Sequence, residues 1–286
     1  MRPLLALAML LAACQPDPPD YAGDMRQQHD GDAPTATAAT EADTAGVTTE
    51  RVRYATVDGE PVTGTLARPA GAEAGLPGVI VIQEWWGLND NVEAMARRLA
   101  AEGYVALAVD LYGGEVATTP DGAMALMREA MGREDALADN LRQAHRYLSG
   151  TVGAPRVGTV GWCFGGMWSL RAALALPAEV DAAVVYYGRP VTDPDRLAAL
   201  QMPVLAFFGG ADESIPQDTV AAFDRALTEA GVEHRVEVYP GAAHAFANPS
   251  GQAYDAAAAE DAWARTTEFF AAHLRPAGPE ATADRP

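Results

Sequence analysis

Short apolar runs alternate with amphipathic stretches along most of the chain. Several runs are apolar throughout, which is typical of strands buried on both faces of a sheet. They lie at residues 77–83, 104–109, 156–160, 182–187 and 203–208. Stretches with helical spacing separate them, at residues 90–101, 121–131, 134–149 and 167–175. This alternation predicts an α/β fold with a mostly parallel central sheet and helices on both faces.

Further elements flank this core. They are a hairpin of residues 52–57 and 62–66 about the turn signal Asp58-Gly59, an alternating strand at 232–239 and a closing helix at 253–273. Asp90 is the predicted N-cap of the 90–101 helix. In sheets of this kind, ligands bind beyond the carboxyl ends of the strands, so chemistry is expected in the loops there.

The two ends of the chain differ from this folded region. Residues 1–13 of the 286 have a short positive start and an apolar run too short to span a bilayer, the pattern of a signal peptide. Residues 14–50 are rich in Asp, Pro, Ala, Thr and Gly and are predicted to be a flexible acidic tether. Residues 51–275 form one predicted α/β domain, and residues 276–286 a disordered tail.

The end of the apolar run carries a cysteine. The sequence Leu11-Ala12-Ala13-Cys14 resembles the lipobox of bacterial lipoproteins. This resemblance implies cleavage before Cys14 and a lipid on its sulfur that anchors the protein in the bacterial cell envelope. Gln15 in the next position favours the outer membrane, facing the periplasm. The alternative is an ordinary secretory signal with an incidental cysteine.

Composition excludes several kinds of chemistry. The net charge is -19 and every basic residue is arginine. An acidic surface argues against nucleic-acid binding. The absence of lysine excludes Schiff-base catalysis, Ser-Lys dyads and P-loop phosphate binding.

One segment points to nucleophilic catalysis. Gly161-Trp162-Cys163-Phe164-Gly165-Gly166 joins the 156–160 strand to the 167–175 helix. Strand, G-x-C-x-G and helix form the nucleophile elbow of the α/β-hydrolases, with cysteine in the position of serine. Glycines are needed there because a Cβ would clash inside the turn. The helix N-terminus favours a thiolate. A buried structural cysteine is the alternative.

Two residues complete a predicted triad with Cys163. Asp212 follows the 203–208 strand and His244 follows the 232–239 strand, which is the nucleophile–acid–histidine order of α/β-hydrolases. The other histidines are set aside for lack of such context; they are His29, His145, His234 and His273. The sequence shows no convincing metal-ligand spacing and no phosphate fingerprint, so we expect no metal and no cofactor.

With these motifs in view, residues 51–273 resemble the dienelactone hydrolase family. The matching segments are Gln83-Glu84-Trp85-Trp86-Gly87-Leu88-Asn89, Val109-Asp110-Leu111-Tyr112, the elbow, Tyr186-Tyr187-Gly188, Gly209-Gly210-Ala211-Asp212 and Gly241-Ala242-Ala243-His244-Ala245-Phe246. The resemblance implies an α/β-hydrolase fold with Cys163 as nucleophile, His244 as base and Asp212 as its orienting acid. It also implies that Glu84 contacts the resting thiol and helps to govern its ionisation.

These roles predict a cofactor-free hydrolase of carboxylic esters or lactones. The thiolate attacks the carbonyl, and water releases the acyl group from the enzyme. The backbone amides of Phe164 and Trp85 are the predicted oxyanion hole.

The predicted substrate site departs from the family pattern. The family's type enzyme binds its substrate's carboxylate with arginines, but Asn248 stands at one of those positions and neither Arg128 nor Arg133 can be assigned to the other. Ala245 replaces a frequent serine. Dienelactone itself is therefore a doubtful substrate. The expected cleft residues are Trp86, Tyr112, Phe246 and Asn248.

Two other functions stay open at this point. One is a non-catalytic envelope lipoprotein that binds a ligand or partner in the cleft. The other is an acyltransferase or thioesterase that keeps the same nucleophile. Fold analogy alone does not choose among them.

Overall fold

The computed structural model describes most of the chain between its two ends. The described residues are 23, 25, 26, 29, 31, 32, 34, 45–72 and 74–275. The predicted signal peptide, Cys14, most of the predicted tether and the 276–286 tail lie outside the described residues. Among the described residues no helix is long and apolar enough to cross a membrane.

An eight-stranded mixed sheet forms the centre of the molecule, in the order β1-β2-β4-β3-β5-β6-β7-β8. The strands are β1 (Val47–Val57), β2 (Glu60–Pro69), β3 (Gly78–Ile82), β4 (Val105–Val109), β5 (Val157–Trp162), β6 (Ala182–Tyr186), β7 (Val204–Gly209) and β8 (His234–Tyr239). β1 pairs antiparallel with β2, and β2 with β4, whereas all later neighbours are parallel. The predicted α/β class and mostly parallel sheet are confirmed.

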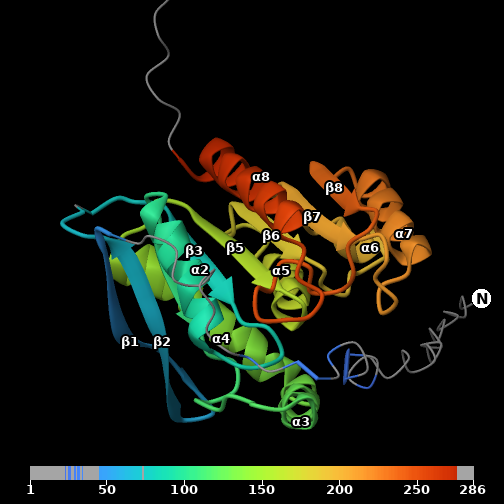
Figure 1. Cartoon of the computed structure of the whole chain (residues 1–286). Helices are drawn as coiled ribbons and strands as arrows, with labels where there is room; N and C mark the ends of the chain where they lie inside the picture. Colours follow the sequence, from blue (N-terminus) through green and yellow to red (C-terminus); the bar gives the residue numbers. More distant parts are fainter. Residues whose placement is uncertain are drawn as a thin grey trace, which may run out of the picture.

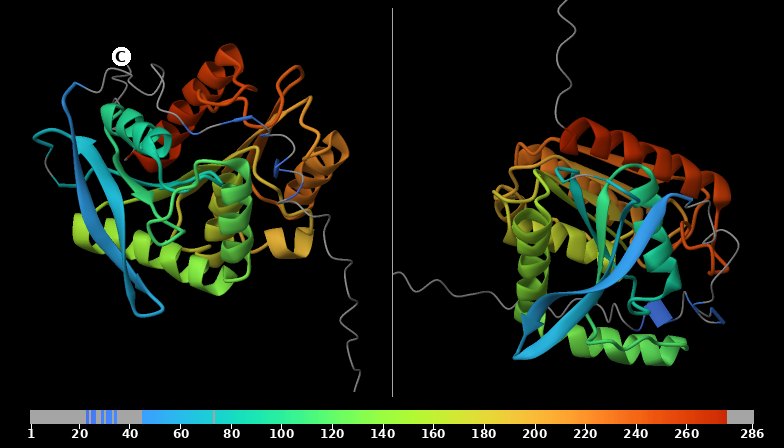
Figure 2. Two further views of the ribbon diagram at one scale, coloured as in Figure 1. Left: turned by 60° about the horizontal axis from the view of Figure 1, so that its bottom comes forward. Right: turned by 90° about the vertical axis from the view of Figure 1, so that its left-hand side faces the viewer.

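Helices cover both faces of this sheet (Figure 1). They are α2 (Asp90–Ala101), α3 (Pro120–Met131), α4 (Glu134–Arg146), α5 (Phe164–Ala175), α6 (Pro194–Leu197), α7 (Gln217–Glu229) and α8 (Ala256–Leu274). α2 and α8 meet where the Arg98 guanidinium lies 4.2 Å from the Trp263 ring centroid. α4 and α5 meet through the ion pair of Glu134 and Arg171. The β1–β2 hairpin and α7 lie at opposite ends of the sheet (Figure 2).

The sequence predicted most elements, with two corrections. The N-cap of α2 is Asn89 rather than Asp90, because Asn89 has extended backbone and accepts a hydrogen bond from the Val92 amide at 3.2 Å. The predicted 134–149 helix is α-helical only to Arg146 and continues as a π-helical segment, Tyr147–Val152.

The sequence analysis missed α6 and α7. α6 has only one turn and gives almost no periodic signal. α7 carries a usable signal, because its buried residues Val220, Phe223, Ala226 and Leu227 fall on one helical face. This helix lies between the Asp212 loop and β8, so it separates two candidate catalytic residues along the chain.

Candidate active site

The elbow holds Cys163 in a strained conformation at the carboxyl end of β5. Cys163 has φ 55° and ψ -117°, and α5 begins at the next residue, Phe164. A Cβ on Gly161 would lie 2.1 Å from the Gly165 carbonyl oxygen, and a Cβ on Gly165 would lie 2.3 Å from the Ile82 carbonyl oxygen. Only glycine fits these approaches, so the G-x-C-x-G spacing is a direct requirement of the turn.

His244 and Asp212 form a buried pair beyond β7 and β8. Nδ1 of His244 and Oδ2 of Asp212 are 2.7 Å apart, and both side chains are at most 1% exposed. The other carboxylate oxygen accepts hydrogen bonds from the amides of Ser214 and Ile215 and from the Ser214 hydroxyl. These bonds fix the carboxylate, which in turn fixes the imidazole so that Nε2 remains for the thiol.

The charges of this site support one another. Burial opposes ionisation of the Cys163 thiol, but the positive charges of His244 and His29 lower its pKa to about 6. Burial likewise opposes protonation of His244, yet Asp212 and the thiolate raise its pKa to about 10. Burial raises the pKa of Asp212, and the His244 charge more than offsets this and lowers it. Both shifts favour the ion pair of a thiolate and an imidazolium over the neutral thiol and imidazole.

Glu84 lies beside this pair but has a different hydrogen-bond partner from the one the resemblance implied. Its Oε2 accepts a 2.6 Å hydrogen bond from Nδ2 of Asn248, and its buried Oε1 has no partner among the described residues. Burial raises the pKa of Glu84 to about 7, and the Cys163 charge adds to this effect. The thiol instead lies close to His244, to His29 and to the Met25 sulfur.

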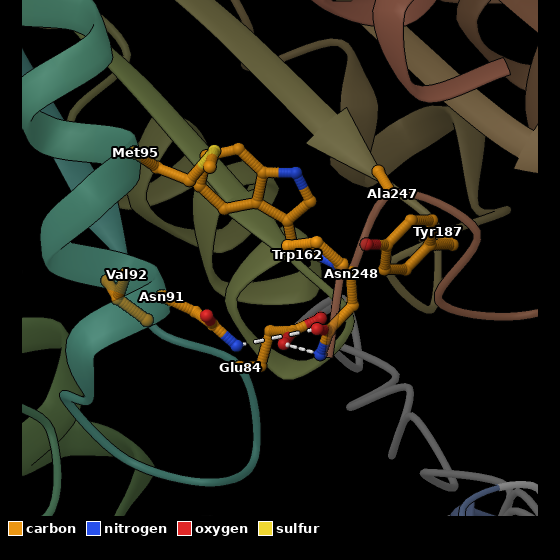
Figure 3. Close-up of a pocket in the computed structure, with 9 residues that line it drawn as sticks. Glu84, Asn91, Val92, Met95, Trp162, Tyr187, Ala247 and Asn248 are labelled. Atoms are coloured by element: carbon orange, nitrogen blue, oxygen red, sulfur yellow. Dashed lines mark hydrogen bonds between the residues drawn. The ribbon is translucent and has the colours of Figure 1, made fainter. Parts of the chain in front are cut away.

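A pocket opens on the Glu84 side of the site (Figure 3). Its lining is mainly apolar, with two amides and one carboxyl group: Glu84, Asn91, Val92, Met95, Trp162, Tyr187, Ala247, Asn248 and Pro249. Oδ1 of Asn248 accepts from Asn91 at 3.5 Å and from the Ser250 hydroxyl at 2.7 Å. The lining contains no arginine, which agrees with the departure seen at Asn248.

The predicted aromatic residues take different places. Trp85 and Trp86 pack edge to face with centroids 5.0 Å apart, and both are buried after β3. The Phe246 ring is also buried and packs 5.2 Å from Tyr187. Tyr112 packs 5.4 Å from Phe164. Of the expected cleft residues, only Asn248 lines the pocket.

Tyr187 is a site residue that the sequence analysis quoted in a motif without giving it a role. Its backbone has φ 36°, its ring lies 5.2 Å from the His244 ring, and its hydroxyl is buried without a partner among the described residues. Its ring also lines the pocket. Arg133, by contrast, forms an ion pair with Asp58 in the β1–β2 turn and is not part of this lining.

The segment before the domain makes the largest correction. Within the predicted tether, Met25 and His29 are 0% and 2% exposed. Met25 Sδ lies 3.6 Å from Cys163 Sγ, and the His29 ring packs 4.9 Å from Trp85 and 5.8 Å from His244. Sequence reasoning set His29 aside because it falls in the predicted tether. The apolar Met25 one helical turn earlier was the available signal.

These contacts create a cluster that sequence spacing could not show. Ligand atoms of His29, Cys163 and His244 all lie within 4.8 Å of one another, and all three residues are buried. The sequence showed no metal-ligand spacing for this group, and its three members meet only in the folded chain. Its members come from distant parts of the sequence.

Comparison with known proteins gives the family. Residues 62–274 match the model of the dienelactone hydrolase family. "Protein usf" of Aquifex pyrophilus is 36% identical over 229 residues, which cover 76% of this chain and 96% of that protein. A "Putative carboxymethylenebutenolidase" of Salmonella typhimurium is 35% identical, covering 74% of this chain and 83% of that protein.

A solved structure agrees in fold. The dienelactone hydrolase-like promiscuous phosphotriesterase P91, from metagenomic libraries, superposes with a TM-score of 0.73 at 26% identity and covers 81% of this chain and 100% of that one. The fold and site define an α/β-hydrolase. The chain belongs to the dienelactone hydrolase family and is an enzyme of its carboxylic-ester hydrolase class.

Proposed function

We propose that the protein hydrolyses carboxylic esters or lactones through Cys163, His244 and Asp212. The observation that supports this proposal is a buried group of three side chains in which the imidazole lies between the thiol and the carboxylate. His244 Nδ1 and Asp212 Oδ2 are 2.7 Å apart. The strained elbow presents the sulfur at the end of the sheet where ligands of such folds bind.

The chemistry proceeds in two halves. The Cys163 thiolate attacks the carbonyl carbon, and the tetrahedral intermediate expels the alkoxide, which takes a proton from the His244 imidazolium. The neutral imidazole then removes a proton from water, which attacks the thioester. Collapse of the second intermediate releases the acid and returns the thiolate, with the proton again on His244. Asp212 keeps the imidazole in the required tautomer throughout.

We assign two backbone amides as the hydrogen-bond donors to the oxyanion of the tetrahedral intermediate. Phe164 is the residue after the nucleophile at the start of α5, and Trp85 lies in the loop after β3. These are the two positions from which α/β-hydrolases supply oxyanion donors. The α5 N-terminus adds its partial positive charge to the same point.

The pocket lining favours uncharged substrates. Asn248 and Asn91 offer amide groups, while Glu84 offers an acid whose pKa is about 7. A carboxylate-bearing substrate would find no cation in this lining and would approach a molecule of net charge -19. We therefore expect neutral esters and lactones to be better substrates than anionic ones of the same size.

A burst experiment tests the proposed mechanism. The full chain carrying Cys14→Ser, so that one reactive cysteine remains, is mixed with neutral aryl esters and small lactones, and with anionic analogues. We expect a burst near one equivalent of leaving group that disappears in Cys163→Ala. The control is His234→Ala, on the far edge strand β8, which keeps the burst. Turnover by Cys163→Ala equal to that of the parent would refute the thiol mechanism.

We further propose that the enzyme is lipid-anchored at Cys14 in the bacterial envelope. The support is the lipobox-like sequence before that residue. Cys14→Ser should move the protein from the membrane fraction to the soluble fraction of cells that express the full chain. Continued membrane fractionation of this variant would count against the anchor.

A further inference from the structure

Two histidines face the Cys163 sulfur, each with a carboxylate behind it. Nδ1 of His244 bonds to Asp212 at 2.7 Å, and Nδ1 of His29 bonds to Asp32 at 2.8 Å. Nε2 is therefore the nitrogen that each ring has left for the sulfur. Both Nε2 atoms are buried and neither has a hydrogen-bond partner among the described residues.

Contacts with the domain hold the segment that carries the second histidine, His29. Asp32 accepts a 3.0 Å hydrogen bond from the Gln252 amide, and Arg26 forms a 2.6 Å ion pair with Asp121 on α3. The His29 amide donates to the Met25 carbonyl at 3.1 Å, which sets both side chains on one face of a turn. In Figure 1 the described parts of this segment, in blue, lie beside α3 and below α5.

The donor set is that of a thiophilic metal site. It comprises two imidazoles, a thiolate and, from Met25, a thioether 3.6 Å from the Cys163 sulfur. Two His, one Cys and a weak Met are typical of copper, and carboxylates behind the imidazoles commonly orient metal ligands. Hydrolysis by the triad needs neither Met25 nor His29–Asp32, so these residues are not explained by it.

We propose that Cys163, His244 and His29, with Met25 as a weak fourth donor, bind one copper ion. The spacing is close to what an ion requires. Bonds of about 2.0–2.3 Å in a tetrahedral site place ligand atoms roughly 3.3–3.8 Å apart. The Met25 and Cys163 sulfurs are already at this separation, and the other donors, within 4.8 Å of one another, need only small movements.

This inference rests on the proposed function at one point, because the metal would occupy the nucleophile and base. A bound ion takes the lone pairs of the thiolate and of His244, so the metal-bound protein cannot form an acyl-enzyme. Binding also releases the proton shared by these groups. The protein would have two exclusive states, a metal-free hydrolase and a metal-bound form.

Affinity measurements on the full chain carrying Cys14→Ser test the proposal. Cu(I), kept reduced under anaerobic conditions, is titrated in competition with a chromophoric chelator, and Zn(II) is titrated in parallel. We expect one Cu(I) per chain, an affinity lowered at least about 100-fold by His29→Ala, and a loss of about 10- to 100-fold in Asp32→Asn. Met25→Leu should weaken Cu(I) more than Zn(II), because thioethers prefer the softer ion.

Matched controls separate this site from surface binding. His234 also pairs with a carboxylate, Asp224, at 3.2 Å, so His234→Ala removes a similar histidine elsewhere and should leave affinity unchanged. The proposal is overturned if Cu(I) binds equally well to His29→Ala or to Cys163→Ser, or if the parent binds none. The burst of the metal-free parent is recorded separately, so its loss would contradict the hydrolase mechanism and not the metal site.

Discussion

At the scale of single residues, the pKa of Cys163 depends on its burial and on charges from three segments of the chain. His244 and His29 lower the pKa of the thiol, while burial and the charge of Glu84 oppose its ionisation. The proximity of Cys163, Asp212 and His244 could be predicted because each follows a strand at the carboxyl end of the sheet. The role of Asn248 as the partner of Glu84 could not, because it depends on the path of a loop in space.

Removing the charge of Asp212 tests the ion pair. In Asp212→Asn the His244 imidazolium loses its main support, so the pKa of His244 falls and that of Cys163 rises. We expect alkylation of the thiol, followed against pH, to shift its midpoint upward from about 6. Turnover should fall roughly 1,000- to 10,000-fold, as for the equivalent change in serine triads. An unchanged alkylation midpoint would show that Asp212 does not govern the pair.

Neutralising Glu84 should shift the pKa of the Cys163 thiol in the opposite direction, downward. Glu84 ionises near pH 7, close to Cys163, so the two groups titrate as a coupled pair over a broad range. In Glu84→Gln we expect the alkylation curve to become a single, steeper step at lower pH. Glu229→Gln on the exposed face of α7 makes the same change in net charge and serves as the control. A midpoint that moves equally in both variants would mean that Glu84 acts only through net charge.

At the scale of elements, the site follows from where strands end. β5, β7 and β8 are parallel, so Cys163, Asp212 and His244 emerge at one edge although helices separate them in sequence. This much is visible in the alternation of apolar runs and turn motifs. The pocket is less predictable, because Asn91 and Met95 belong to α2 and meet the Asn248 loop only after the layers pack.

The elbow itself gives a stability prediction. Gly165→Ala would place a Cβ 2.3 Å from the Ile82 carbonyl oxygen and 2.5 Å from that of Gln83, and neither backbone atom can rotate away. We expect the free energy of unfolding in urea to fall by several kcal/mol, about 3 or more. Gly150→Ala meets nothing within 4 Å and should stay within about 1 kcal/mol of the parent. Equal stabilities for the two variants would contradict the close approach of β3 to α5.

At the scale of the whole molecule, the segment at residues 25–32 changes the site more than any loop of the domain. Sequence analysis assigned it to a flexible tether because its composition is polar and lacks periodicity over a long window. The decisive contacts, Met25 with Cys163 and His29 with Trp85, connect it to residues far along the chain. The spacing of Met25 and His29 hints at a shared face, but it does not say which distant residues that face meets.

Deleting residues 1–45 should expose the thiol. Met25 and His29 cover Cys163, which is fully buried in their presence. If the free energy of docking the segment against the domain is about 1.4 kcal/mol, its loss raises the rate of alkylation about tenfold. The measurement is made across a range of pH values and compared on the high-pH plateau, so that a change in the pKa of the thiol is separated from a change in its exposure. Deleting residues 276–286 instead should leave the rate unchanged, and equal rates for both truncations would show that the segment does not shield the sulfur.

The match to the family begins at residue 62, upstream of which lie Met25, His29 and Asp32. Two relatives could therefore align without a gap over the whole shared domain and keep the same three residues. They could still differ in which substrates reach the cysteine sulfur. In such relatives the difference would lie in the segment before the shared domain, which a comparison of the domain alone leaves out. Enzymes of this family should be compared as whole chains, because trimming them to the shared domain removes the segment that contacts the thiol.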